Sequence, residues 1–110
     1  MNKRNVLRHL KKALLIIKEV GWCQKSLAIN LHGASVRPES PFAIAWCAIG
    51  ALDVSAGRAQ VMDTECFLKA NLPKPFGTVH SFNDHSKTKK KDVVKLFNKC
   101  ISKLQSYDVK

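Results

Sequence analysis

Two Trp-Cys dipeptides and one Phe-Asn-Asp tripeptide are the parts of this sequence best suited to chemistry. The indole rings of Trp22 and Trp46 could form the walls of a pocket and stack on a flat ligand. The thiol of Cys23 would lie at its entrance, with amide and carboxylate groups on the polar side. The sequence therefore permits a ligand pocket built from Trp22, Cys23, Gln24, Trp46, Phe82, Asn83 and Asp84.

A cysteine can also act as a nucleophile when a base lies within hydrogen-bond reach of its thiol. Cys23, with His80 or His85 and with Asp84, would supply a Cys-His-Asp set of this kind. A general base must satisfy that geometry before its pKa matters, and spacing along the chain does not establish it. We therefore assign no catalytic residue and expect a non-enzymatic domain.

A structural role explains the same residues more simply. Trp46 and Cys47 lie within a long apolar segment, where burial in the core is the expected role. Trp22 would pack where the first helix ends, and Phe82 would anchor a loop on the core. Asn83 would hydrogen-bond the backbone of that loop, as Asx residues commonly do. The sequence favours this interpretation over a pocket.

The cysteines and histidines form no local site in the sequence. The four cysteines are separated by 24, 19 and 34 residues, so no Cys-x-x-Cys pair occurs. Because zinc sites use closely spaced ligand pairs, we expect neither a metal nor a cofactor. We predict four reduced, largely buried cysteines. His9 and His32 have no evident partner and are expected at the surface.

Hydrophobic periodicity predicts about four helices. Apolar residues recur at three- and four-residue steps over 5–20, 58–71 and 88–106. The segment 41–52 is apolar on every side, which predicts a central helix capped by Ser40, with Pro41 at its first position. Within it, Gly50 costs about 1 kcal/mol relative to alanine. A neighbouring backbone in close contact would account for this glycine.

The intervening segments lack such periodicity. Residues 22–39 are expected to be irregular, with a short extended piece at 26–31, and residues 73–86 form a long loop. The predicted fold is therefore all-α, a compact single domain spanning residues 1–110, with about four helices and a long loop before the last helix.

Positive charge is concentrated near the two ends of the chain, which has a formal net charge of +11. Residues 1–20 hold six basic and one acidic side chain, and residues 81–110 hold eight and three. If the first and last helices are neighbours, their outer faces would form one positive surface for a polyanion. The residues predicted to bind it are Arg4, Arg8, Lys11, Lys12, Lys89, Lys90, Lys91, Lys95 and Lys99.

Lysines spaced four apart on the last helix supply point charges suited to a phosphate backbone, without the arginine, asparagine and glutamine clusters that recognise bases. We expect sequence-indifferent nucleic-acid binding or binding of an acidic protein. A third hypothesis is a phage-encoded protein that binds a host factor.

The apolar run 13–17 is too short for a secretory signal, and no run spans a bilayer. The expected location is cytoplasmic, without membrane binding; the oligomeric state is left open.

The same short motifs resemble an uncharacterised bacterial and bacteriophage domain family of unknown function. Its pattern has a first helix ending in Gly-Trp-Cys-Gln, a Pro-initiated helix with Trp-Cys-x-x-Gly-Ala, and Phe-Asn-Asp before a final helix. These motifs start here at Gly21, Trp46 and Phe82. The family pattern has glycine after the glutamine, where this chain has Lys25. The resemblance implies a helical intracellular domain and no established activity.

Overall fold

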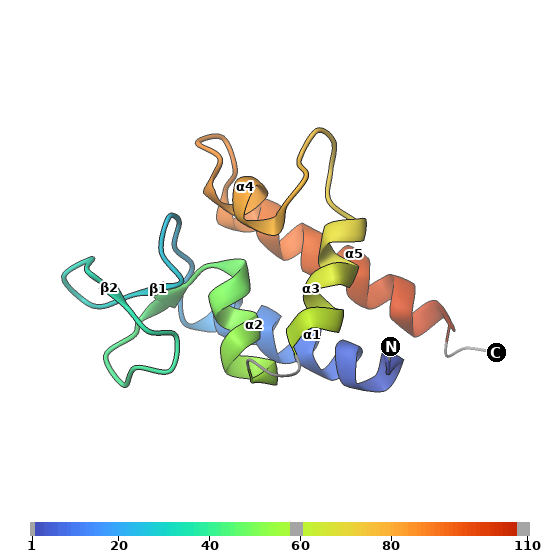
Figure 1. Cartoon of the computed structure of the whole chain (residues 1–110), viewed down its shortest axis with the longest axis horizontal. Coiled ribbons are helices and arrows are strands. Elements are labelled where there is room, and N and C mark those ends of the chain that lie inside the picture. The colour runs from blue at the N-terminus through green and yellow to red at the C-terminus, as the bar shows by residue number, and fades with distance from the viewer. Residues whose placement is uncertain (1, 58–60, 108–110) are drawn as a thin grey trace.

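The computed structural model describes residues 2–57 and 61–107, which form five helices and a small sheet (Figure 1). In chain order the elements are α1 (Lys3–Glu19), β1 (Ala28–Ile29), β2 (Ser35–Val36), β3 (Ala45–Trp46), α2 (Ala48–Ala56), α3 (Val61–Ala70), α4 (Val79–Asp84) and α5 (Lys90–Tyr107). The mainly helical class predicted from the sequence is confirmed. The extended piece predicted at 26–31 contains β1, but the other two strands, the pairing of the sheet and α4 were not predicted.

The hydrophobic core lies where α1 packs against both α2 and α5. The apolar face expected for the first helix is buried, including Leu10 and Ile17. The apolar face of α5 is buried as well, including Phe97 and Leu104, and α2 adds Leu52. The periodicity of the first and last helices therefore identified most of the core-facing side chains, although Val20, at the end of the predicted first helix, is exposed.

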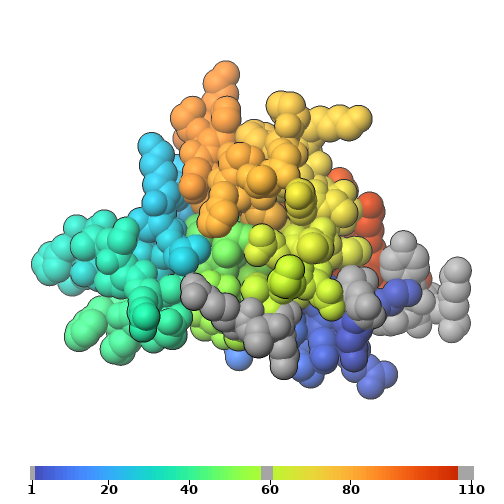
Figure 2. Space-filling view, viewed as in Figure 1, coloured from blue at the N-terminus to red at the C-terminus, as the bar shows by residue number. Residues whose placement is uncertain are grey.

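The three strands form an antiparallel sheet in the order β2-β1-β3, beside the helical body (Figures 1 and 2). Ala28 in β1 pairs with Val36 on one side and with Trp46 on the other. On its other side, Trp46 forms a parallel bridge with Trp22. The chain that follows α1 is thus joined to the chain that precedes α2.

The predicted start of the central helix is wrong. The helix begins at Ala48, and the segment before it makes a turn and then β3. The hydroxyl of Ser40 accepts a hydrogen bond from the N–H of Phe42, which is a turn contact, so Ser40 does not cap a helix. Pairing with β1 overrides the local preference, because the backbone groups of Ala45 and Trp46 are satisfied by the sheet.

The predicted loop 73–86 contains the short helix α4. Thr78 caps it: its hydroxyl accepts from the N–H of Ser81, and the Ser81 hydroxyl accepts from the Thr78 N–H in return. The third helix was predicted over 58–71. It is observed from Val61 to Ala70, and residues 58–60 lie outside the described part of the chain.

His9 is buried, so its predicted surface position is wrong. Only 5 % of its surface is exposed, and its Nδ1 lies 3.2 Å from the hydroxyl of Thr64, joining α1 to α3. Burial, together with the neighbouring charges of Arg8 and Lys12, lowers the pKa of His9 below its ordinary value of 6.5. The histidine was assigned to the surface because its partner is 55 residues away in the sequence.

We predict that the domain loses stability as the pH falls below about 6.5, partly through His9. The unfolded chain takes up a proton at this histidine near pH 6.5, whereas the folded chain takes it up only at lower pH. The stabilisation is therefore complete above pH 6.5 and is lost toward the folded-state pKa. Urea unfolding between pH 7 and pH 5 measures it: His9→Gln should flatten this slope, and the exposed control His32→Gln should not. Equal slopes in all three proteins would contradict it.

Candidate functional site

The three sequence motifs meet at the side chain of Asn83, which is fully buried. Its Oδ1 accepts hydrogen bonds from the indole N–H of Trp22 at 2.8 Å and from the backbone N–H of Ala48 at 3.0 Å. Its Nδ2 donates to the carbonyl oxygen of Cys23 at 3.1 Å and to Oδ1 of Asp84 at 2.9 Å. All four hydrogen-bonding positions of the amide are used.

Gln24 adds a second connection between the same parts of the chain. Its side-chain amide lies 2.9 Å from the carbonyl oxygens of both Asn83 and His85, and 3.3 Å from that of Thr88. The side chain therefore donates to the backbone from the end of α4 to the residues just before α5. This fixes the segment after α1 against the start of the last helix.

Trp46 and Cys47 lie in β3 and at the helix cap, and not inside the helix as predicted. The indole N–H of Trp46 donates to the carbonyl oxygen of Pro38 at 2.8 Å. The Sγ of Cys47 accepts a hydrogen bond from the N–H of Gly50 at 3.3 Å and so caps α2. Trp46 is thus the last residue of β3, and Cys47 is the N-cap of α2.

The buried thiols are not activated as nucleophiles. Burial is the main cause that raises the pKa of Cys23 to about 11, with further contributions from Cys47 and Asp84. Burial also raises the pKa of Cys47, and that of Cys100 to about 11. These groups are thiols at neutral pH, whereas the thiolate is the nucleophile. Cys66 is exposed, which corrects the prediction for that residue.

The predicted pocket residues are packed against one another. Trp22, Cys23, Gln24 and Asp84 all contact Asn83 or the backbone beside it. No buried side-chain nitrogen or oxygen within the described residues lacks a hydrogen-bond partner. The described residues also contain no group of three or more His, Cys, Asp or Glu side chains placed to hold a metal ion. The cluster therefore directs its polar groups inward.

Lys25 adopts the left-handed conformation, with φ of 69°, directly after Gln24. Its backbone N–H donates to Oδ1 of Asp84 at 2.8 Å. The turn after Gln24 is therefore made by a lysine in a conformation that favours glycine. A side chain in this conformation costs about 1–2 kcal/mol.

We predict that Lys25→Gly stabilises the domain by about 1 kcal/mol, because removal of the strain exceeds the entropy that glycine gains in the unfolded chain. The midpoint of urea unfolding measures this change. Lys87→Gly, at an exposed lysine without positive φ, is the matched control and should not stabilise. Equal changes in the two variants would show that the conformation of Lys25 carries no strain.

The basic residues of α1 form an exposed strip. Arg4, Arg8, Lys11 and Lys12 are all exposed. Their side chains make no hydrogen bond or ion pair with the residues that the structure describes. A shallow groove of about 510 Å³ runs between these side chains and is completed by Leu7 and Leu15, on one face of the helix. We call this surface, with Arg4, Leu7, Arg8, Lys11, Lys12 and Leu15, the α1 strip.

The α5 lysines lie on two sides of their helix. Lys90 donates to the carbonyl oxygen of Lys18 at the end of α1, at 3.1 Å. Lys99 and Lys103 donate to the carbonyl and side-chain oxygens of Asn71, just after α3, at 3.3 and 2.6 Å. Lys90 and Lys99 are about two and a half turns apart, so they point to opposite flanks. These contacts also place cations at the C-terminal ends of α1 and α3, where they are favourable.

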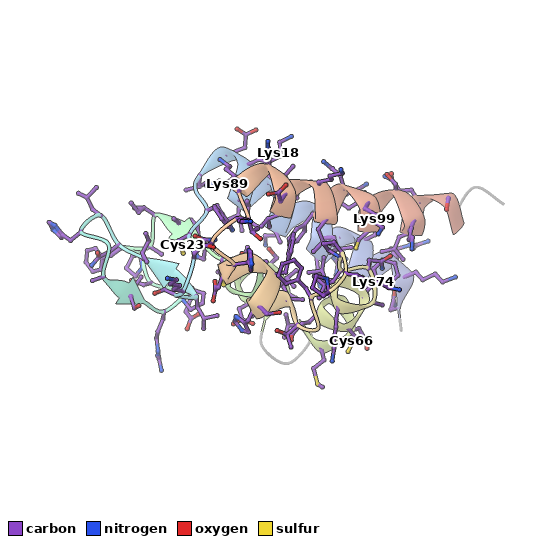
Figure 3. The ribbon with its side chains drawn as sticks, turned by 90° about the horizontal axis from the view of Figure 1, so that it is seen from above. Lys18, Cys23, Cys66, Lys74, Lys89 and Lys99 are labelled. Carbon is purple, nitrogen blue, oxygen red and sulfur yellow. The ribbon has the colours of Figure 1, made fainter. Side chains whose placement is uncertain are left out.

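The first and last helices are therefore neighbours, as the charge hypothesis required. However, Lys99 and Lys103 contact Asn71 just after α3, whereas the groove of the α1 strip is lined by residues of α1 alone. Figure 3 shows Lys18 and Lys89 near the start of α5 and Lys99 farther along it. The predicted basic residues of α1 and the lysines Lys95 and Lys99 of α5 therefore line different hollows of the surface.

Fold and site together define a small, mainly helical domain whose motifs join around one buried asparagine. The chain belongs to a family of unknown function, DUF6197, whose model matches residues 1–103. This agrees with the expectation of a family without an established activity. Neither a curated protein nor a solved structure matches the chain. No helix in the described segments is long and apolar enough to cross a membrane.

Proposed function

We propose that this domain binds an acidic macromolecule through the α1 strip, with the phosphate backbone of nucleic acid as the leading candidate. The observation that carries the proposal is the group of four exposed cations without partners among the described residues. A duplex presents one negative charge per about 1.7 Å, so several of these cations could contact phosphates at once.

The position of the cations in α1 supports a binding role. The first turn contains no acidic residue, and Lys3 and Arg4 lie there instead. The N-terminus of a helix carries partial positive charge, so cations there are unfavourable by about 0.3–1 kcal/mol each. A structural role would favour the opposite charge, whereas an anionic partner would offset this cost.

An acidic protein is the second candidate, and the apolar part of the α1 strip favours it. Leu15 is 59 % exposed, and Leu7 is half-buried between the cations. A phosphate backbone leaves these side chains in water, whereas a protein surface with both acidic and apolar residues would cover them. A host factor bound by a phage-encoded protein would belong to this class.

Fluorescence-anisotropy titrations with labelled single- and double-stranded nucleic acids, over a series of salt concentrations, test the leading candidate. We expect affinity to fall steeply with salt and to vary little with sequence. Arg8→Glu combined with Lys12→Glu should weaken binding by roughly tenfold or more at low salt. Lys69→Glu combined with Lys74→Glu is the control with the same change in charge at exposed positions away from α1.

No binding at submillimolar concentration in low salt would overturn nucleic acid as the partner. If the α1 variant and the control variant lost the same affinity, binding would depend on the net charge of the domain and not on the α1 strip. Titration with an acidic, amphipathic peptide then tests the second candidate. Binding of the peptide that requires Leu15 as well as Arg8 would support a protein partner.

Arg4→Glu separates stability from binding. We predict that this variant is more stable than the parent by about 0.5 kcal/mol, because it places an acidic residue in the first turn of α1. The same variant should bind the polyanion more weakly. Urea unfolding and anisotropy on one preparation measure both effects. A variant that is destabilised, or that binds as tightly as the parent, would contradict the prediction.

A further inference from the structure

A cavity of about 360 Å³ lies between the end of α3, helix α4 and the first half of α5. Its apolar wall comes from Pro73, Phe82 and Leu96. Lys95 and Lys99 stand at its edge. None of these residues belongs to the α1 strip. The cavity therefore offers an apolar surface next to positive charge, at a place that the proposed function does not use.

The two lysines provide unused donors. They are one turn apart on α5, so their side chains extend from the same flank. Lys99 donates one hydrogen bond to the carbonyl oxygen of Asn71, which leaves two of its three N–H groups. The side chain of Lys95 contacts no hydrogen-bond or ion-pair partner in the described segments. Both ammonium groups can therefore donate to a ligand.

One carboxylate also lines the cavity and limits the charge that a ligand can carry. Asp92 accepts a hydrogen bond from the backbone N–H of Lys89 through Oδ2, at 2.8 Å, at the start of α5. The ammonium groups of Lys95 and Lys99 and the carboxylate of Asp92 together give the lining of the cavity a net charge of +1. A monoanion balances this charge, whereas a phosphate dianion would exceed it.

The apolar wall of the cavity favours a ligand that contains an aromatic ring. Phe82 packs edge-to-face against Phe76, with ring centroids 5.3 Å apart at 69°. A further ring can extend such an aromatic pair. The volume lies near the lower end of the range for ligand sites, about 300–1,000 Å³, which limits the ligand to a small molecule.

We propose that this cavity binds a small aromatic carboxylate. The carboxylate pairs with Lys95 and Lys99, and the ring lies against Phe82 and Leu96. This site is separate from the α1 strip, so either proposal can fail without the other.

Chemical-shift titration of the labelled full chain with 1-naphthoate tests this proposal in moderate salt. We expect saturable shifts centred on the amides of residues 92–99, with a Kd of about 1 mM or tighter. The neutral 1-naphthamide and inorganic phosphate should each bind at least about tenfold more weakly, because each lacks the charge or the ring.

Lys95→Gln should weaken naphthoate binding at least about fivefold, since it removes a charge from the cavity edge. Lys91→Gln, at an exposed position one turn earlier on the same helix, is the matched control and should bind like the parent. Arg8→Glu should also bind naphthoate normally, which distinguishes this site from the α1 strip. Absence of saturable shifts up to 10-fold above the expected Kd, equal binding of the amide, or equal effects of the two lysine variants would overturn the proposal.

Discussion

Replacing Asn83 by leucine is expected to lower the free energy of unfolding by about 4 kcal/mol, since each buried group left unpaired costs about 1–3 kcal/mol. The substitution keeps a side chain of similar size but removes every hydrogen bond of the amide. The indole N–H of Trp22, the backbone N–H of Ala48 and the carbonyl of Cys23 would lose their contacts with it. A loss of this size is a large share of the stability of a small domain.

Asn83→Asp separates the hydrogen bonds that the Asn83 side chain accepts from those that it donates. Its carboxylate can still accept from Trp22 and Ala48, but it cannot donate to Cys23 and it places a second negative charge beside Asp84. We therefore expect a clear destabilisation that is smaller at low pH, where the new carboxyl is protonated.

Urea unfolding monitored by circular dichroism measures these variants. Asn98→Leu is the matched control, because Asn98 lies on an exposed face of α5. It should change stability by less than about 0.5 kcal/mol. If Asn83→Leu differed from this control by less than about 1 kcal/mol, the network would not be a main source of stability.

Gly50→Ala is expected to destabilise the domain by about 2–3 kcal/mol, although alanine is the better helix former by about 1 kcal/mol. A Cβ at position 50 would lie 1.9 Å from the carbonyl oxygen of Leu27. That oxygen accepts a hydrogen bond from the N–H of Cys47. The backbone just before β1 and the N-terminal cap of α2 would therefore have to move apart. Close backbone contact was the predicted reason for this glycine, and the structure confirms it.

Gly77→Ala provides the control for Gly50→Ala. A Cβ at Gly77 would meet nothing within 4 Å, so the substitution should be neutral or slightly stabilising. Thermal and urea unfolding of both variants give the comparison. A Gly50→Ala variant as stable as the parent would mean that α2 and the backbone at Leu27 can move apart at little cost in free energy.

Features that depend on neighbours three or four residues apart could be predicted from the amino-acid sequence alone. The buried faces of α1 and α5 follow from side-chain periodicity, because a helix repeats every 3.6 residues. Close packing at Gly50 and the excess of positive charge on α1 were also evident in the sequence.

Features that depend on distant partners could not be predicted from the sequence and follow from the packing of the folded chain. Two-residue strands have almost no periodicity, so the pairing of Ala28 with Trp46 and the late start of α2 could not be predicted. The partner of His9 is 55 residues away, and Asn83 is bonded to two distant segments, at Trp22–Cys23 and at Ala48. The flank on which the α5 lysines lie depends on how α5 packs between α1 and α3. Spacing along the chain determines which residues share a helix face, whereas packing determines what that face contacts.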